Sequence, residues 1–280
     1  MKVGSYEIFA VEAETFRLDG GAMFGVVPRT LWEKTNPPDD KNRIRMTTRV
    51  LVLRGDGRTA IVDAGIGAKE TEKFRGIYAM GRAGSLVESL AQRGVAAADV
   101  TDVILSHLHF DHAGGGTRRD GDRVVPAFPR ANYHVQRVNL AQARRPNDRD
   151  RASFFPDNFE PLALAGVLRE HDPDAEILPG VFARVTNGHS PGHQMIEVID
   201  GHDSVAFVGE TAPMTSHLPT PYVMGYDLEP VVTMEEKKTW LPRWAERGTV
   251  LVFDHDPDTG AARIEPGARG YFQISERITL

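Results

Sequence analysis

The sequence contains no cysteine, and this absence narrows the chemistry that the protein can perform. Disulfide bonds, thiolate nucleophiles, iron–sulfur clusters and cysteine-ligated zinc sites are all excluded. A metal site in this chain must therefore be built from histidine and carboxylate side chains.

Long apolar runs and an excess of basic residues are absent as well. No apolar run reaches the length of about 18 residues that a transmembrane helix needs. Glu7 and Glu12 interrupt the N-terminal segment where a signal peptide would be apolar. The net charge of −6 favours neither nucleic acid nor an anionic membrane as a partner. We therefore expect a cytoplasmic protein.

Strand-like and helical patterns alternate along the chain and predict one α/β domain spanning residues 1–280. Strands are expected at 6–18, 48–53, 59–62, 103–105, 182–185, 196–199, 205–208 and 250–253. Gly55-Asp56-Gly57 predicts a hairpin between two of them. One helix is expected to begin at a Ser85 cap with Glu88 in a capping box, and another at Thr233 with Glu236.

A polar, proline-containing stretch at about 144–161 interrupts this pattern. It carries Arg144, Arg145, Arg149 and Arg151, with Asp148 and Asp150 between them. Interleaved charges favour a solvated loop over a groove for an acidic substrate. Long irregular segments in compact domains are often lids or binding loops, so we expect a lid or loop insertion here.

The segment from Ser106 to His112 carries the strongest chemical signal. Side chains two residues apart in an extended chain project to the same side, so His107 and His109 can hold one metal together. A turn directly afterwards, eased by the glycines at 114–116, lets Asp111 and His112 face a second metal. Such a density of ligands favours a metal site over an exposed turn with accidental histidines.

Three further candidate ligands each follow a strand-like run. His189 comes after 182–185, Glu210 after 205–208 and His255 after 250–253. A lone histidine after a strand is more often structural, but α/β folds collect their sites at the carboxyl ends of strands. The repetition therefore favours one shared site.

His107-Leu108-His109-Phe110-Asp111-His112 resembles the HxHxDH signature of the metallo-β-lactamase superfamily. The remaining family pattern follows in order: Asp63 matches an aspartate that orients the ligands, residues 188–193 resemble the GHTPGH segment, and His255 matches the final ligand. The resemblance implies that His107, His109 and His189 hold one metal, and that Asp111, His112 and His255 hold the other. It also implies a four-layer αβ/βα sandwich with the metals at one edge, between the sheets.

Three positions depart from the pattern or stay open. Glu210 stands where the family usually has a bridging aspartate; it can bridge or chelate, or it can swing away and leave a looser second site or a single metal. His217 lies in a loop rich in proline and tyrosine, and is either a catalytic donor to a carbonyl oxygen or part of the loop packing. His193 is expected to support the site from a turn.

The resemblance implies a metal-dependent hydrolase with two divalent transition-metal ions, zinc first, with iron, manganese and cobalt as alternatives. Two such ions can share a water and generate a bridging hydroxide near neutral pH, and Asp111 is a candidate to orient it or accept its proton. Residues 18–25 resemble an N-terminal loop that borders the substrate pocket in the lactonase and organophosphate hydrolase group. Pro213, however, stands where lactonases of that group commonly have a tyrosine.

We therefore expect hydrolysis of a small lactone or carboxylic ester, with a homodimer left open. An apolar rim is predicted, formed by Met23, Phe24 and Phe110, with Phe154 and Phe155 added if the 144–161 segment folds over the site. A thioesterase or phosphoesterase of the same fold, and a mononuclear iron oxidoreductase like the persulfide dioxygenases, are the alternatives.

Overall fold

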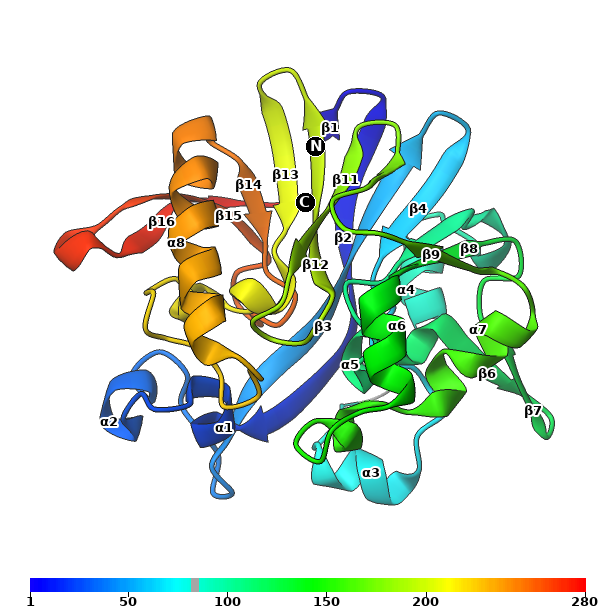
Figure 1. Ribbon diagram of the computed structural model, residues 1–280, viewed down its shortest axis with the longest axis horizontal. Coiled ribbons are helices and arrows are strands. Elements are labelled where there is room, and N and C mark those ends of the chain that lie inside the picture. The colour runs from blue at the N-terminus through cyan, green and yellow to red at the C-terminus, as the bar shows by residue number, and fades with distance from the viewer. Residues whose placement is uncertain (82–85) are drawn as a thin grey trace.

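Two seven-stranded sheets form the middle of the molecule (Figure 1). The structure is a computed structural model that describes residues 1–81 and 86–280. The first sheet has the order β1 (Lys2–Val3), β2 (Tyr6–Asp19), β3 (Arg43–Gly55), β4 (Arg58–Val62), β5 (Asp102–Ile104), β8 (Asn132–Gln136) and β9 (Leu168–His171). The second has the order β10 (Glu176–Leu178), β11 (Val181–Thr186), β12 (His193–Asp200), β13 (Asp203–Phe207), β14 (Val250–Val252), β15 (Ala261–Pro266) and β16 (Phe272–Ile278). A separate hairpin is formed by β6 (Thr117–Asp120) and β7 (Arg123–Pro126).

Helices cover the outer faces of both sheets and complete a four-layer αβ/βα sandwich. Figure 1 shows α4 (Leu86–Gln92), α6 (Arg137–Arg144) and α7 (Glu160–Leu164) on one side and α8 (Pro230–Arg247) on the other. The remaining helices are short: α1 (Gly20–Phe24), α2 (Arg29–Trp32), α3 (Glu72–Ile77) and α5 (Phe110–Ala113). The predicted fold class is confirmed.

The continuous apolar runs of the sequence are explained by burial on both faces of each sheet. In β3, Leu51 and Leu53 face the layer between the sheets, whereas Val50 and Val52 belong to the cluster beneath the first set of helices. In β13, Val205 and Phe207 face the inter-sheet layer, while Ala206 packs with Trp244 of α8. Because strand side chains alternate, a strand buried on both faces has no polar positions to alternate with.

Most of the predicted elements are present, β3 and β12 are longer than expected, and the predicted hairpin joins β3 to β4. Its turn residues Asp56 and Gly57 both have positive φ, 50° and 69°, as a two-residue turn of the right twist requires. The predicted Ser85 cap lies outside the described residues. The start predicted for α8 was wrong: the helix begins at Pro230, which needs no amide donor at a first helical position. Thr233 lies inside the first turns, and Glu236 accepts a hydrogen bond from the amide of Asn187 instead of closing a capping box.

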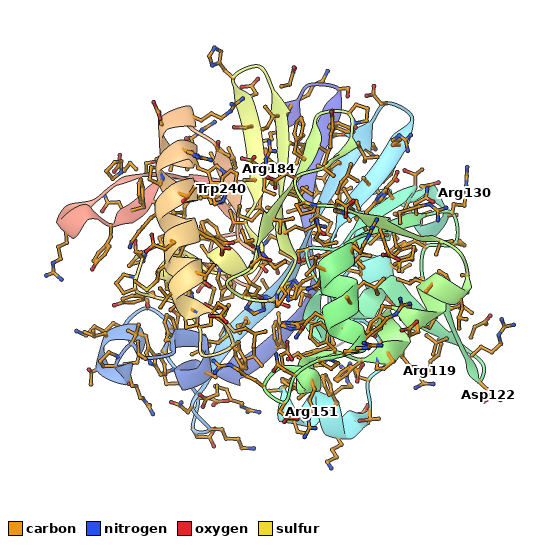
Figure 2. The ribbon with its side chains drawn as sticks, viewed as in Figure 1. Arg119, Asp122, Arg130, Arg151, Arg184 and Trp240 are labelled. Carbon is orange, nitrogen blue, oxygen red and sulfur yellow. The ribbon has the colours of Figure 1, made fainter. Side chains whose placement is uncertain are left out.

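The segment at 144–161 is partly ordered into short helical turns. Turns at Arg151–Ser153 and Pro156–Asn158 connect the end of α6 to the start of α7. Backbone bridging joins Phe154 to His109, which brings the segment against the histidine cluster. Figure 2 shows Arg151 at the molecular surface, where it pairs with Asp148. Among the described residues, no helix has both the length and the hydropathy to cross a membrane.

Candidate metal centre

The seven predicted ligands converge at one edge of the sandwich, where several strands end. His107 and His109 follow β5, and α5 then carries Asp111 and His112. The other three come from the second sheet: His189 follows β11, Glu210 lies in a short turn after β13, and His255 follows β14. All seven are buried, and their donor atoms form two clusters.

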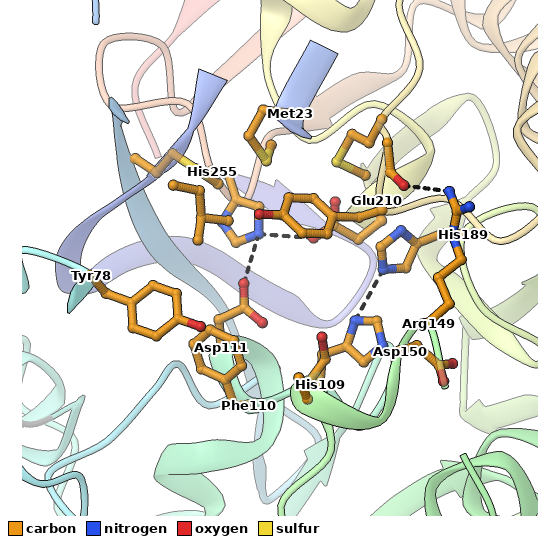
Figure 3. Close-up of a pocket in the computed structure, with 17 residues that line it drawn as sticks. Met23, Tyr78, His109, Phe110, Asp111, Arg149, Asp150, His189, Glu210 and His255 are labelled. Atoms are coloured by element: carbon orange, nitrogen blue, oxygen red, sulfur yellow. Dashed lines mark hydrogen bonds and ion pairs between the residues drawn. The ribbon is translucent and has the colours of Figure 1, made fainter. Parts of the chain in front are cut away.

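The first cluster consists of His107, His109 and His189, whose ring nitrogens lie within 4.8 Å of one another. His109 Nδ1 is 3.1 Å from His189 Nε2, a contact drawn in Figure 3. Burial, with neighbouring histidines adding to it, holds the pKa of His107 and His109 well below its usual value. Neutral imidazoles offer lone pairs, and His107 Nε2 has no hydrogen-bond partner among the described residues. These are the properties of a metal-ligating set.

The second cluster consists of Asp111, His112, Glu210 and His255. Glu210 Oε1 lies 3.0 Å from His112 Nε2 and 2.9 Å from His255 Nε2. Asp111 Oδ2 is 3.6 Å from His255 Nε2 and 3.8 Å from His112 Nε2. Glu210 is therefore not swung away, and its second oxygen is buried without a partner among the described residues. Two imidazoles and two carboxylates around one space fit a divalent cation.

Hydrogen bonds from outside each cluster fix the orientation of its rings. Asp63 accepts from Ser106 through the amide (2.6 Å) and the hydroxyl (2.8 Å), and from His112 Nδ1 (2.8 Å). This bond places the His112 proton on Nδ1 and turns Nε2 toward Glu210. His255 Nδ1 donates to Thr47 O at 2.9 Å in the same way. The supporting role expected of Asp63 thus has a direct geometric basis.

Asp227 is a functional residue that the sequence did not predict. Its Oδ1 accepts from His189 Nδ1 at 3.0 Å, which leaves His189 Nε2 directed into the first cluster. Burial opposes a charge on His189, but the bond to Asp227 and the negative charges of Glu210 and Asp227 together raise the pKa of His189. Asp227 lies in a loop with no local motif, so no pattern in the sequence could have found it.

His193 supports the site through Glu210. Its Nε2 accepts from the Glu210 amide at 3.1 Å, and its Nδ1 lies 2.5 Å from Thr186 Oγ1. The ring is fully buried, and burial keeps its pKa well below the usual value. His193 therefore holds the main chain of Glu210 rather than a metal.

The reason for glycine at positions 114 and 115 differs from the expected one, which was that glycine eases a turn. Gly114 has φ of −57°, which any residue can adopt. A Cβ at Gly114 would lie 2.1 Å from Ile66 O, and one at Gly115 would lie 2.1 Å from Ala64 O. These glycines are required because the turn after Asp63 packs directly against their backbone.

His217 belongs to neither ligand cluster, and its contacts fit the loop-packing alternative. Its Nε2 donates to Met23 O at 2.8 Å, and its ring stacks on Phe24 at 4.6 Å between centroids. Burial lowers the pKa of His217 to about 4, so the ring is neutral. Because this fully buried ring is absent from the lining of the site, its role is to pack the loop against α1.

A cavity of about 390 Å³ opens above both clusters (Figure 3). Its apolar lining comes from Leu18, Met23, Met46, Phe110 and Met224, and its phenols are Tyr78 and Tyr226. Phe24 was wrongly predicted for this rim, because it is buried between Trp32 and His217. Phe154 and Phe155 do not line the cavity either; the 144–161 segment contributes Arg149, Asp150, Ala152 and Ser153.

Comparison with known proteins identifies the family. Residues 44–255 match the family model described as the metallo-beta-lactamase superfamily. The chain belongs to this superfamily. The protein is thus a member of a metallohydrolase superfamily, and its two ligand clusters are suited to divalent metals.

Individual relatives agree with this assignment. A probable metallo-hydrolase of Mycobacterium tuberculosis is 25% identical over 280 residues, with 85% of each chain covered. An N-acyl homoserine lactonase of Bacillus cereus is 32% identical over 111 residues, 40% of this chain and 38% of that protein. Among solved structures, a probable metal-dependent hydrolase from Staphylococcus aureus has a TM-score of 0.90 at 27% identity, with both chains fully covered. The dizinc quorum-quenching lactonase AidC has a TM-score of 0.82 over 100% of this chain and 97% of its own, and at 18% identity it supports the fold alone.

Proposed function

We propose that the protein is a dinuclear metal-dependent hydrolase of a small lactone or carboxylic ester. The observation that carries this proposal is the position of the two ligand clusters at the base of a mostly apolar cavity. His107, His109 and His189 would hold one ion, and Asp111, His112, Glu210 and His255 the other, with zinc as the first choice for both. Two divalent ions held there would lower the pKa of a shared water and polarise the oxygen of an ester.

The chain's own groups would supply the rest of the reaction. Asp111 lies at the boundary between the second cluster and the cavity, so its carboxylate can orient the attacking water and accept its proton. Neither the Tyr78 nor the Tyr226 hydroxyl bonds to another described residue, so both are free to donate to the carbonyl oxygen. Burial raises the pKa of both phenols, which keeps the donors protonated. We propose these tyrosines for the donor role that was one of the two alternatives for His217.

The cavity supports a neutral ester better than a phosphate ester. Arg149 is the only arginine or lysine among the described residues that line it. Its Nη2 is already bonded to Gly225 O at 2.5 Å and to Asp227 O at 3.0 Å. The guanidinium therefore closes the wall instead of offering an anion site, and the surrounding methionines suit an acyl chain.

A substrate panel tests the proposal. The metal-loaded protein would be assayed by proton release with an acyl lactone, an aryl ester, a thioester and a phosphate ester. We expect turnover of the lactone or aryl ester, and loss of that turnover after chelation. Turnover of the thioester or the phosphate ester alone would leave the family assignment intact and refute this substrate class.

A further inference from the structure

Asp254 is a buried carboxylate to which the proposed reaction gives no role. It follows β14 directly and precedes the ligand His255. Its side chain is 2% exposed, and neither of its oxygens has a hydrogen-bond partner among the described residues. Burying an ionised carboxylate without a partner is strongly unfavourable, so buried acids are normally paired or bound to a metal.

The groups nearest to Asp254 cannot satisfy it by ordinary hydrogen bonds. Its Oδ2 lies 3.9 Å from His112 Nδ1 and 3.7 Å from His255 Nε2. His112 Nδ1 is already bonded to Asp63 at 2.8 Å, and His255 Nε2 is 2.9 Å from Glu210. Both histidines are thus engaged, which leaves a cation as the natural partner.

Asp254 lies beside the second cluster, close to one of its ligand nitrogens. Its Oδ2 is 3.7 Å from His255 Nε2, while the oxygen of Asp111, a member of the second cluster, is 3.6 Å from the same nitrogen. Glu210 Oε2 is buried in this region and unpartnered as well. Three carboxylate oxygens without a hydrogen-bond partner among the described residues, both of Asp254 and one of Glu210, therefore lie near the imidazoles of the second cluster.

We propose that Asp254 is an additional ligand of the cation held by Asp111, His112, Glu210 and His255. This inference rests on the proposed dinuclear centre but not on the substrate. The second position then has three carboxylates and two imidazoles, whereas the first has three imidazoles. Imidazole ligands suit zinc, and additional oxygen ligands favour harder ions such as manganese, which accept more ligands. The preference for Zn²⁺ over Mn²⁺ is therefore narrower at the second position than at the first.

Metal titrations of the metal-free protein test this inference without measuring catalysis. Zn²⁺ binding would be followed by competition with a coloured chelator, and Mn²⁺ binding by the electron paramagnetic resonance signal of the free ion. In the wild-type protein, one Zn²⁺ should fill the first position and one Mn²⁺ should then bind at the second. Asp254→Asn should weaken this Mn²⁺ binding by roughly 10–100-fold and leave the first Zn²⁺ unchanged.

Asp102→Asn provides the matched control. Asp102 is equally buried, but it is bonded to His134 at 2.9 Å and belongs to neither cluster. Its substitution should leave both metal affinities unchanged. Equal Mn²⁺ affinity in wild type and Asp254→Asn would overturn the inference.

If Asp254→Asn does not fold, the wild-type titration decides. Equal ratios of Zn²⁺ to Mn²⁺ affinity at the two positions would then refute the inference. A protein that binds the metals as described but hydrolyses no ester would refute the proposed function and leave this inference standing.

Discussion

The floor and the wall of the cavity are built in different ways. The floor, defined as the seven ligand residues of the two clusters, comes from the ends of strands and from α5, and outside hydrogen bonds fix several of its rings. The wall, defined as the segments 18–25, 149–153 and 224–226 with Tyr78, comes from the end of β2, the short helix α1, and loops and turns. Rigid elements hold reacting groups, and loops around them vary with less effect on the fold. Chemistry should therefore depend on the floor, and substrate preference on the wall.

The largest effect is expected from a change in the floor at Glu210. Glu210→Ala removes the oxygen that contacts both His112 and His255, so metal content should fall below two ions per chain and hydrolysis should fall to near background. Glu210→Asp keeps the carboxylate and should retain much of both. Elemental analysis and the ester assay measure the two quantities. Unchanged metal content in the alanine variant would show that Glu210 is not a ligand.

Asp227 joins the two regions, because it lies in the wall loop but orients a floor histidine. Asp227→Asn should weaken metal binding at the three-histidine position by about 10–100-fold, since the amide holds the His189 ring less firmly. Chelator competition measures this affinity. An affinity equal to that of the wild type would place Asp227 among purely structural loop residues.

A smaller and different effect is expected in the wall at Arg149. Arg149→Met removes the bonds to Gly225 and Asp227, so KM should rise by roughly five- to tenfold, about 1–1.5 kcal/mol, with metal content unchanged. Arg151→Met is the matched control, because Arg151 is on the same segment and pairs only with exposed Asp148. If Arg149→Met lowered kcat without changing KM, the wall would contribute to the chemistry, and the proposed division of roles between floor and wall would be wrong.

The last effect is on stability, not on catalysis, and concerns the anchor beneath the wall. Lys237 is fully buried in α8 and donates to the carbonyl oxygens of His217, Pro219 and Tyr222. Burial lowers the pKa of Lys237 from its usual 10.5 to about 7. At a pH between these two pKa values, Lys237 is protonated in the unfolded chain but largely neutral in the folded protein. The unfolded chain then binds more protons, so the free energy of unfolding should rise with pH from about 7 to about 10.

Denaturant titrations at several pH values measure this dependence. Subtracting the values for Lys237→Met isolates the contribution of Lys237 from the rest of the chain. The difference should grow by about 1–2 kcal/mol between pH 7 and 9. A difference that stays flat over this range would show that Lys237 is charged in the folded protein.

The sequence predicted the floor well and the wall poorly, for a physical reason. His107 and His112 could be predicted as ligands because they lie in a dense local motif. His189 and His255 could be predicted because each follows a strand-like apolar run. The wall depends on contacts between segments that are distant in the sequence. Phe24, for example, was predicted to line the cavity but is buried, because Trp32 and His217 stack against its ring. Asp227 could not be found for the same reason, since only the folded chain brings it to His189. Asp254 adjoins His255 in the sequence, but only the folded chain shows that its carboxylate is buried without a hydrogen-bond partner among the described residues.

The contact between Gly114 or Gly115 and the turn at Ala64–Ile66 bears on how the protein can be engineered. Randomising either glycine would eliminate almost every member of a library, because any Cβ there would collide with a backbone oxygen. At Gly121, in the tip of the β6–β7 hairpin, a Cβ would meet no atom within 4 Å. That tip offers open space for an affinity tag, an immobilisation handle or a fused module.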